Sequence, residues 1–185
     1  MSGPPGSGKT SLARKIADEF RLPLIAKDDI KESLFDSLGV QDRAWSKQLG
    51  RATYELMYYF AATQLAAGRS FIIESNFNES AAPRWRALQA QHDFVPLQIL
   101  CYAEPAVLVE RFKARWASGT RHPGHVDHEI TEQEFATFRR YAPLDLGGDV
   151  VEIDTTDFEK IDYTNLSDFI GNRLSRAKMP RTQKF

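Results

Sequence analysis

Residues Gly3 to Thr10 read GPPGSGKT and match every fixed position of the phosphate-binding pattern GxxxxGK[ST]. Glycines let consecutive backbone N–H groups turn inward, and the N-terminus of the helix that follows favours anions. The stretch therefore predicts a loop that holds the phosphates of a nucleotide. A Gly/Pro-rich surface loop is the disfavoured alternative, because an amphipathic helix follows at once. The residues expected to bind the nucleotide here are Gly3, Gly6, Ser7, Gly8, Lys9, Thr10 and Ser11.

Two side chains of this loop are suited to the chemistry of a nucleotide triphosphate. Lys9 would reach the β- and γ-phosphates as a point charge, which makes it a candidate catalytic residue. The Thr10 hydroxyl has the size and hardness to ligate Mg²⁺. ATP and Mg²⁺ are therefore the expected cofactors.

The start of the sequence lacks an element that such a loop normally has. A phosphate-binding loop follows a buried strand, and here only Met1 and Ser2 precede Gly3. That strand is usually central, so without it two neighbouring strands lack a ladder partner and the core contains a slot. We expect an apolar strand upstream of Met1. An intact mass of the native protein that matches 185 residues would contradict this expectation.

The composition indicates a single cytoplasmic enzyme domain over residues 1–185. A chain of 185 residues is long enough for one sizeable core. Its net charge of −1 provides no general attraction to nucleic acid or to a membrane surface. No stretch approaches the ~18 apolar residues of a membrane span. The one cysteine, Cys101, lies in an apolar run and is expected to be a buried hydrophobe. The sequence leaves the oligomeric state open.

Helical and extended patterns alternate along the chain, which favours an α/β fold. We expect a three-layer sandwich in which helices cover both faces of a central parallel sheet. The expected strands are 22–26, 70–74, 95–102 and 150–154. The expected helices are 9–20, 28–38, 42–67, 83–92, 105–116 and 163–177, and the tail 179–185 is expected to fray. In the long helix, the residues available for burial are Trp45, Leu49, Leu56, Tyr59, Phe60 and Leu65.

Polar residues follow the predicted strands at the edge where a parallel sheet binds ligands. Asp28 and Asp29 follow the first strand, and Glu74 ends the second. Phosphoryl transfer needs a carboxylate beside the acceptor hydroxyl and carboxylates that hold Mg²⁺ directly or through water. These three residues are the candidates, and only one of the adjacent aspartates is expected to face the site. The structural alternatives are that Asp28 caps its helix and that Glu74 is a solvated strand end.

Residues 109–128 are predicted to form a lid over the phosphates. Arg111 and Arg115 are four residues apart on one helical face, and the irregular run 119–125 follows them. A guanidinium binds phosphoryl oxygens bidentately and offsets the charge that develops in transfer. Arg115 and Arg121 are the candidates for that role.

Two alternatives apply to the same segment. For Arg111 alone, a surface ion pair with Glu104 or Glu110 is the favoured interpretation. A metal site is disfavoured, because no cysteine or HExxH pattern accompanies the histidines. The residues that raise it are His122, His125, His128, Asp127 and Glu129.

With these residues in place, the chain resembles the P-loop kinases, the group that includes polynucleotide 5′-kinases, zeta toxins, chloramphenicol phosphotransferase and gluconate kinase. Three segments carry the likeness, which covers most of the chain: GPPGSGKT, KDDIK at 27–31 and IESNFN at 73–78. The resemblance implies a P-loop NTPase sandwich with Asp28 as general base. It also implies that Arg111 and Arg115 are the lid pair, with Arg111 at the nucleotide and Arg115 as transition-state stabiliser. The residues that it places at the acceptor are Lys31, Glu74 and Asn76, and Glu74 is also a candidate Mg²⁺ ligand.

The predicted function is transfer of the γ-phosphate of Mg-ATP to a hydroxyl of a small molecule. Lys31 cannot make the bidentate fork of an arginine on a phosphate, so a nucleic acid 5′ end is the less favoured acceptor. The alternative from another class is a nucleotide-hydrolysing ATPase or switch module without an acceptor. No Asn-Lys-x-Asp guanine signature supports that alternative, and the chain has no room for an AAA helical subdomain. A non-catalytic binding protein is the third interpretation.

Overall fold

The computed structural model describes residues 1–125 and 141–177. The strands in this part of the chain pair in parallel. Strand β1 (Leu24–Ala26) pairs with β2 (Ile72–Glu74), and β3 (Leu97–Tyr102) pairs with β4 (Asp149–Asp154). The register brings Ala26 opposite Glu74, so the carboxyl ends of these two strands lie at one edge. The predicted α/β class with a central parallel sheet is confirmed.

Met1 and Ser2 connect the two strand pairs. The amino group of Met1 donates to the Ile73 carbonyl of β2 at 2.7 Å. The backbone N–H of Ser2 donates to Ile99 of β3 at 2.9 Å, and the N–H of Cys101 donates to the Ser2 carbonyl at 2.8 Å. These two residues therefore take the central position between β2 and β3, where the sequence predicts a whole strand.

The edges of β2 and β3 that face each other also border a cavity of about 720 Å³. Its lining is largely apolar and includes Ile72 and Ile73 on one side, Leu97 on the other, and Ile170 and Leu174 from the last helix. The slot expected from the sequence is therefore present. An apolar strand upstream of Met1 stays a prediction.

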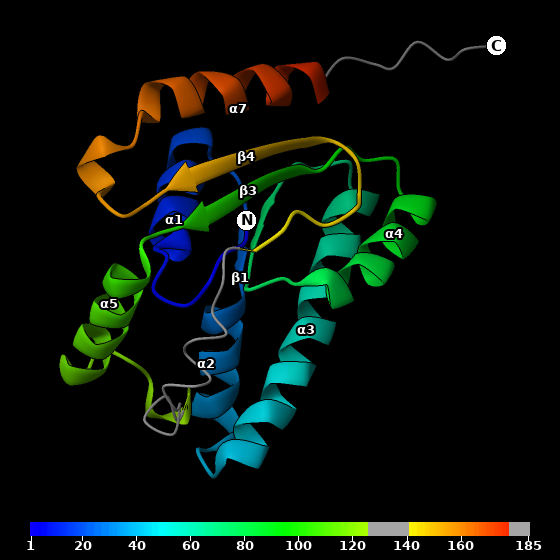
Figure 1. Ribbon diagram of the computed structural model, residues 1–185. Coiled ribbons are helices and arrows are strands. Elements are labelled where there is room, and N and C mark those ends of the chain that lie inside the picture. The colour runs from blue at the N-terminus through cyan, green and yellow to red at the C-terminus, as the bar shows by residue number, and fades with distance from the viewer. Residues whose placement is uncertain (126–140, 178–185) are drawn as a thin grey trace.

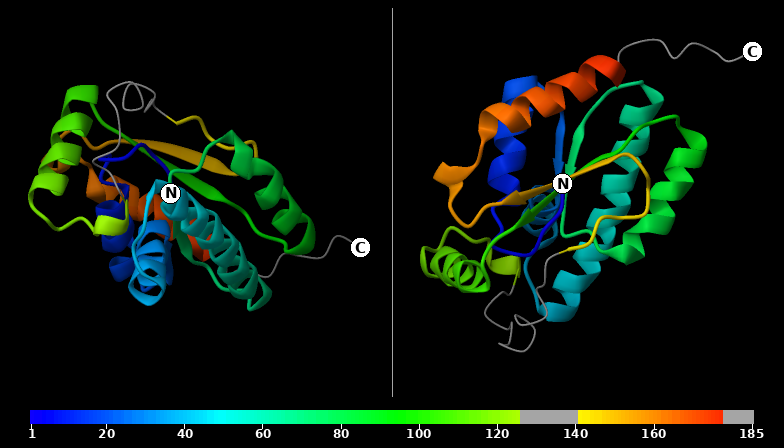
Figure 2. Two further views of the ribbon diagram at one scale, coloured as in Figure 1. Left: turned by 90° about the horizontal axis from the view of Figure 1, so that it is seen from below. Right: turned by 45° about the horizontal axis from the view of Figure 1, so that its top comes forward.

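Helices cover both faces of the sheet, as Figures 1 and 2 show. On one face, α1 (Lys9–Phe20) and α7 (Tyr163–Ala177) pack on β3 through a core that includes Leu12, Ile99 and Ile170. On the other face, α3 (Arg43–Ala66) and α4 (Ala82–Gln91) pack around Met57, Tyr58 and Trp85. The two apolar clusters make the three-layer arrangement that alternating helices and strands favour.

Two further helices lie near the carboxyl ends of the strands. Helix α2 (Lys27–Leu38) follows β1 directly, and α5 (Pro105–Ala117) follows β3. The short 3₁₀ turns are η1 (Glu79–Ala81), η2 (Pro123–His125) and η4 (Phe158–Lys160). No helix in residues 1–125 and 141–177 has the length and hydrophobicity needed to cross a bilayer. The predicted fraying concerns residues 179–185, which lie outside the described part of the chain.

Helix α3 begins where the sequence predicts and buries Leu49 as expected, but not all of the aromatic residues predicted to be available for burial. The Asp42 side chain accepts the N–H of Trp45 at 2.8 Å and so caps the helix. The buried positions are Ser46, Leu49, Thr53, Met57, Tyr58 and Ala61, and apart from the adjacent Met57 and Tyr58 they are three or four residues apart, as one face of a helix requires. Tyr59 and Phe60 are 64% and 40% exposed, so the expectation that they add to the core was wrong.

Candidate active site

The phosphate-binding loop connects Ser2 to α1 and leaves the start of that helix open to an anion. Gly8 is the N-cap of α1, with a φ of +68°, and no side chain caps the helix. The first N–H groups of a helix lack partners within it, so those of α1 are available to phosphate oxygens. The seven residues predicted to bind the nucleotide all belong to this loop or to the first turn of α1, where Ser11 is exposed.

Gly8 also meets a side chain from a distant part of the sequence. A Cβ at this position would overlap the ring of Phe158 in η4. The loop is therefore held from outside by an aromatic ring that no sequence motif indicates.

We expect Gly8→Ala to destabilise the apoprotein more than Gly68→Ala does. Both glycines have left-handed backbone, with φ of +68° and +64°, and an alanine there costs about 1–2 kcal/mol. Only Gly8 also meets a ring, and that overlap costs about 1–3 kcal/mol more. Urea unfolding of both variants measures the difference. Equal losses would contradict the proposed contact, and Gly8→Ala combined with Phe158→Ala should remove the extra loss.

Lys9 and Thr10 both contact the carboxylate of Glu74. The Thr10 hydroxyl donates to Glu74 Oε2 at 2.9 Å, and Lys9 Nζ lies 3.8 Å from Oε1. Glu74 is 2% exposed, so the alternative interpretation of Glu74 as a solvated strand end was wrong. Burial lowers the pKa of the Lys9 ammonium, while the charges of Glu74 and Asp28 oppose that change. A hydroxyl beside a carboxylate at a phosphate loop is the oxygen donor set that Mg²⁺ prefers, so Thr10 and Glu74 fit this ion.

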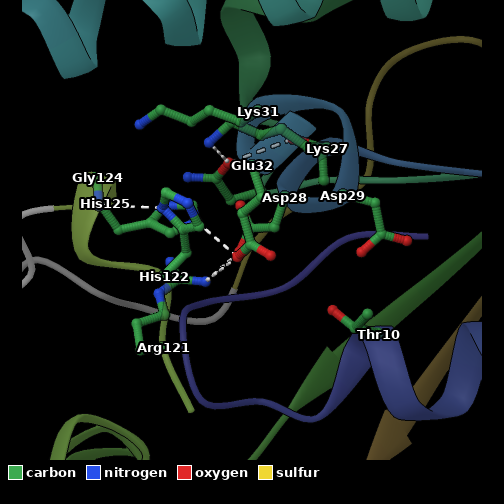
Figure 3. Close-up of polar contacts among 12 residues, drawn as sticks. Thr10, Lys27, Asp28, Asp29, Lys31, Glu32, Arg121, His122, Gly124 and His125 are labelled. Atoms are coloured by element: carbon green, nitrogen blue, oxygen red, sulfur yellow. Dashed lines mark hydrogen bonds and ion pairs between the residues drawn. The ribbon is translucent and has the colours of Figure 1, made fainter. Parts of the chain in front are cut away.

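The two adjacent aspartates of α2 point to different places. Asp29 makes an exposed ion pair with Arg14 at 2.9 Å. Asp28 accepts from Arg121 Nη1 at 2.7 Å, and Figure 3 shows Arg121 approaching it from the loop that follows α5. The N-cap of α2 is Ala26, so Asp28 does not cap its helix. Of the pair, Asp28 is the one that acts on the charge of Lys9, so the prediction that one of the two faces the phosphate loop applies to Asp28.

Nearby charges keep Asp28 ionised. Burial alone would raise the pKa of its carboxyl, but Arg121, then His125 and Lys27, outweigh that effect and hold the pKa well below its usual range. Asp28 in turn acts on the charge of Lys9, which places it within electrostatic range of the phosphate loop.

Arg111 lies against the segment after β4. Its guanidinium donates to the Thr156 carbonyl at 3.0 Å and lies 5.0 Å from the centre of the Phe158 ring. The favoured surface pair with Glu104 or Glu110 was therefore wrong. Arg111 Nη1 is buried without a hydrogen-bond partner in the described residues, and a bound nucleotide would supply an acceptor for it.

Arg115 is one turn further along α5. Its guanidinium lies 6.0 Å from the centre of the Phe112 ring. It also acts on the charge of Lys9, lowering the pKa of that ammonium. The predicted lid arginine is therefore within electrostatic range of the phosphate loop.

Asn76 is fixed by three donors. Its Oδ1 accepts from Lys27 Nζ at 3.2 Å, from Tyr54 OH at 3.1 Å and from Ser75 Oγ at 3.2 Å. Asn76 also shares a hydrogen bond with Tyr141, where burial raises the pKa of the phenol. These residues form a hydrogen-bonded polar cluster around Asn76. Among them, only Asn76 was predicted to touch the acceptor.

Lys31 points into the protein. Its ammonium donates to Ser46 Oγ of α3 at 2.9 Å and lies 5.3 Å from the centre of the Phe35 ring, and the residue is 8% exposed. It thus links α2 to α3. An acceptor-binding role for Lys31 stays a prediction.

The histidines of the predicted lid pair with acidic residues of α2. His125 Nε2 lies 2.9 Å from Glu32 Oε1, and His122 Nε2 lies 3.2 Å from Asp36 Oδ1. Within the described ranges, no three His, Cys, Asp or Glu side chains are placed to hold a metal ion. The other residues of that alternative, Asp127, His128 and Glu129, lie outside the described residues.

Some contacts of the site were missed by reasoning from the sequence. No local sequence pattern indicates that Phe158 contacts the phosphate loop or that Tyr54 binds Asn76. Glu32 and Asp36 do carry one, because they repeat Asp28 at intervals of four residues and so share a face of α2.

Comparisons with known proteins agree with the fold class. The model of the AAA domain family matches residues 1–143. The crystal structure of a "putative kinase" from Chloroflexus aurantiacus J-10-fl is similar, with 40% identity, a TM-score of 0.87, and coverage of 92% of this chain and 94% of that one. An unliganded sugar kinase from Janibacter sp. HTCC2649 shares 15% identity with a TM-score of 0.52, over 94% of this chain and 91% of that one, a likeness in fold alone. The comparison with curated proteins found no match. The subgroup named from the sequence stays a prediction, but the chain belongs to the AAA domain family and has a P-loop kinase-like fold.

Proposed function

We propose that the protein transfers the γ-phosphate of Mg-ATP to a hydroxyl of a small molecule. The observation that supports this most is that two carboxylates have separate partners: Glu74 at the end of β2, and Asp28 in the first turn of α2. Glu74 contacts Lys9 and Thr10, on the side of the phosphate loop. Asp28 is ionised and remains available for the proton of an acceptor.

In this proposal, each residue of the site has a separate role. Asp28 orients the acceptor hydroxyl and takes its proton, while Lys9 and Arg115 offset the charge that develops on the transferred group. Arg111 contacts the nucleotide. Thr10 and Glu74 would hold Mg²⁺, which neutralises phosphate charge when bound.

A small acceptor fits the charges better than a nucleic acid end does. The Lys31 ammonium, which would have to meet a phosphate of the nucleic acid, is buried against Ser46. The net charge of −1 adds no general attraction to a polyanion. Asn76, Tyr54 and Tyr141 are neutral hydrogen-bonding groups, and Tyr54 lies within electrostatic range of Asp28. Such groups recognise hydroxyls.

A transfer screen tests the proposal. Wild-type protein and the Lys9→Met variant are incubated with ATP labelled in the γ-phosphate and with sugars, nucleosides, antibiotics or 5′-hydroxyl oligonucleotides. We expect label on one class of small molecule with the wild type and none with Lys9→Met. Label that appears only as free phosphate would contradict the kinase proposal and favour the hydrolase.

A further inference from the structure

We propose that Arg121 is a positioning residue, which holds the Asp28 carboxylate in place so that its free oxygen meets the acceptor hydroxyl. This inference rests on the proposed function, because it assumes that Asp28 is the general base. It adds a residue that acts through Asp28 and not on the phosphates, where the sequence had placed Arg121 as an alternative to Arg115.

The geometry divides the two oxygens of Asp28. Oδ2 accepts from Arg121 Nη1 at 2.7 Å. Oδ1 has no hydrogen-bond partner within residues 1–125 and 141–177, so it is free to accept from an alcohol. The Arg121 side chain is 11% exposed, and Nη1 also lies 3.7 Å from Glu32 Oε1. A charge-assisted bond to a largely buried guanidinium restricts the carboxylate more than an exposed pair does.

The segment that carries Arg121 is itself fixed on α2. Residues 121–125, here called the latch, contact one face of that helix (Figure 3). Histidines of the latch pair with Glu32 and Asp36, one and two turns beyond Asp28. The ring of Phe35 stacks on His122 at 5.3 Å.

Gly124 sets how closely the latch approaches α2. A Cβ on Gly124 would overlap the ring of Phe35. Together with the two histidine pairs, this contact fixes the register between latch and helix. Arg121 is therefore held opposite Asp28 and not elsewhere along α2.

Arg121 is also the group that decides the charge of Asp28. The other groups that act on this carboxylate are Lys27 on α2, His125 on the latch, Glu32 one turn along α2, Lys9 on α1 and Tyr54 on α3. Burial lowers the pKa of His125 to about 3, so its ring is neutral near pH 7. Arg121 has the largest opposing effect on the pKa of Asp28.

The expected dependence of kcat on pH is set by the ionisation of Asp28. Asp28 can accept a proton only when it is ionised, which is the case above its pKa. With Arg121 present, that pKa lies well below its usual range, so the base is ready at neutral pH. Without Arg121, the largest effect that opposes burial is lost, so the pKa of Asp28 rises and the acid limb of the kcat profile moves to higher pH.

The experiment is an NMR titration of the full-length protein labelled with ¹³C at the aspartate carboxyl carbons, without nucleotide or acceptor. The Asp28 signal is assigned by its loss in Asp28→Asn. In Arg121→Ala we expect its midpoint to rise by about 1 to 3 pH units. Arg121→Lys keeps the charge without the planar fork, so a smaller rise is expected. Arg14→Ala, which breaks the Asp29 pair, should leave the Asp28 midpoint unchanged.

Kinetics complete the test. The acid limb of kcat should shift with the NMR midpoint in Arg121→Ala and recover in part in Arg121→Lys, with the KM for ATP unchanged. An unmoved Asp28 midpoint in either folded variant would overturn the inference, and so would a kcat profile that coincides with that of the wild type. Failure of the wild type to label any acceptor in the screen would instead overturn the proposed function.

Discussion

Replacing Asp28 by asparagine is expected to lower acceptor-dependent turnover by ~10² to 10⁴ while leaving the affinity for ATP nearly unchanged. Asparagine keeps the size of the side chain but cannot accept the proton. Asp28 belongs to α2 and pairs with Arg121, whereas the phosphate loop contacts Glu74, so we expect nucleotide binding to depend little on Asp28. Turnover with the acceptor and calorimetry with Mg-ATP measure the two effects separately.

The neighbouring residue supplies the matched control. Asp29→Asn removes the same charge one position along α2, but Asp29 pairs with Arg14 at the surface. We expect near wild-type turnover for Asp29→Asn. Near-normal turnover in Asp28→Asn as well would reject the role of Asp28 as base.

Replacing Arg115 by alanine is expected to lower kcat by about 10³ with little change in the KM for ATP. Its guanidinium acts on Lys9 electrostatically, and its full contact with the transferred group would form only when the lid closes. An interaction made mainly in the transition state affects kcat and not ground-state binding. Steady-state kinetics over a range of ATP concentrations separate the two parameters.

Two substitutions on the same helix act as comparisons. Lys113→Ala removes a positive charge from an exposed position of α5 and should leave both parameters near those of the wild type. Arg111→Ala should mainly raise the KM for ATP, because Arg111 packs on Phe158 beside the loop. An equal loss of kcat in Arg111→Ala would reverse the ranking of the two arginines.

Much of the fold could be predicted because its signals are local. The periodicity of apolar residues gave α1 its bounds, Lys9–Phe20, and Gly39 ends α2, where its N–H donates to Phe35 at 2.8 Å. The first strand is shorter than expected, because pairing with β2 begins only at Leu24. The burial of Tyr59 and Phe60 was predicted wrongly, because an aromatic-rich helix shows no sign of which face will meet the sheet.

The candidate site also has one part that local sequence signals predict and another that depends on contacts between distant segments. The phosphate loop is contiguous, so one octapeptide identifies it. The partner of Asp28 is 93 residues away in sequence, and no spacing rule connects Arg121 to it. Lys31 was expected to face a ligand, but its direction depends on Ser46 of another helix. Contacts between distant segments require the packed fold before they can be known.

The central place of Ser2 gives this protein a native reporter of sheet opening. Cys101 is the one cysteine, is 1% exposed, and hydrogen-bonds through its backbone to Ser2. Burial raises the pKa of its thiol to about 12, and the side chain packs in the core with Leu12 and Ile170, so a maleimide reacts only when this part of the core opens. The alkylation rate of the wild type therefore measures how often this part of the core opens, and a bound nucleotide that stabilises the neighbouring loop should slow it.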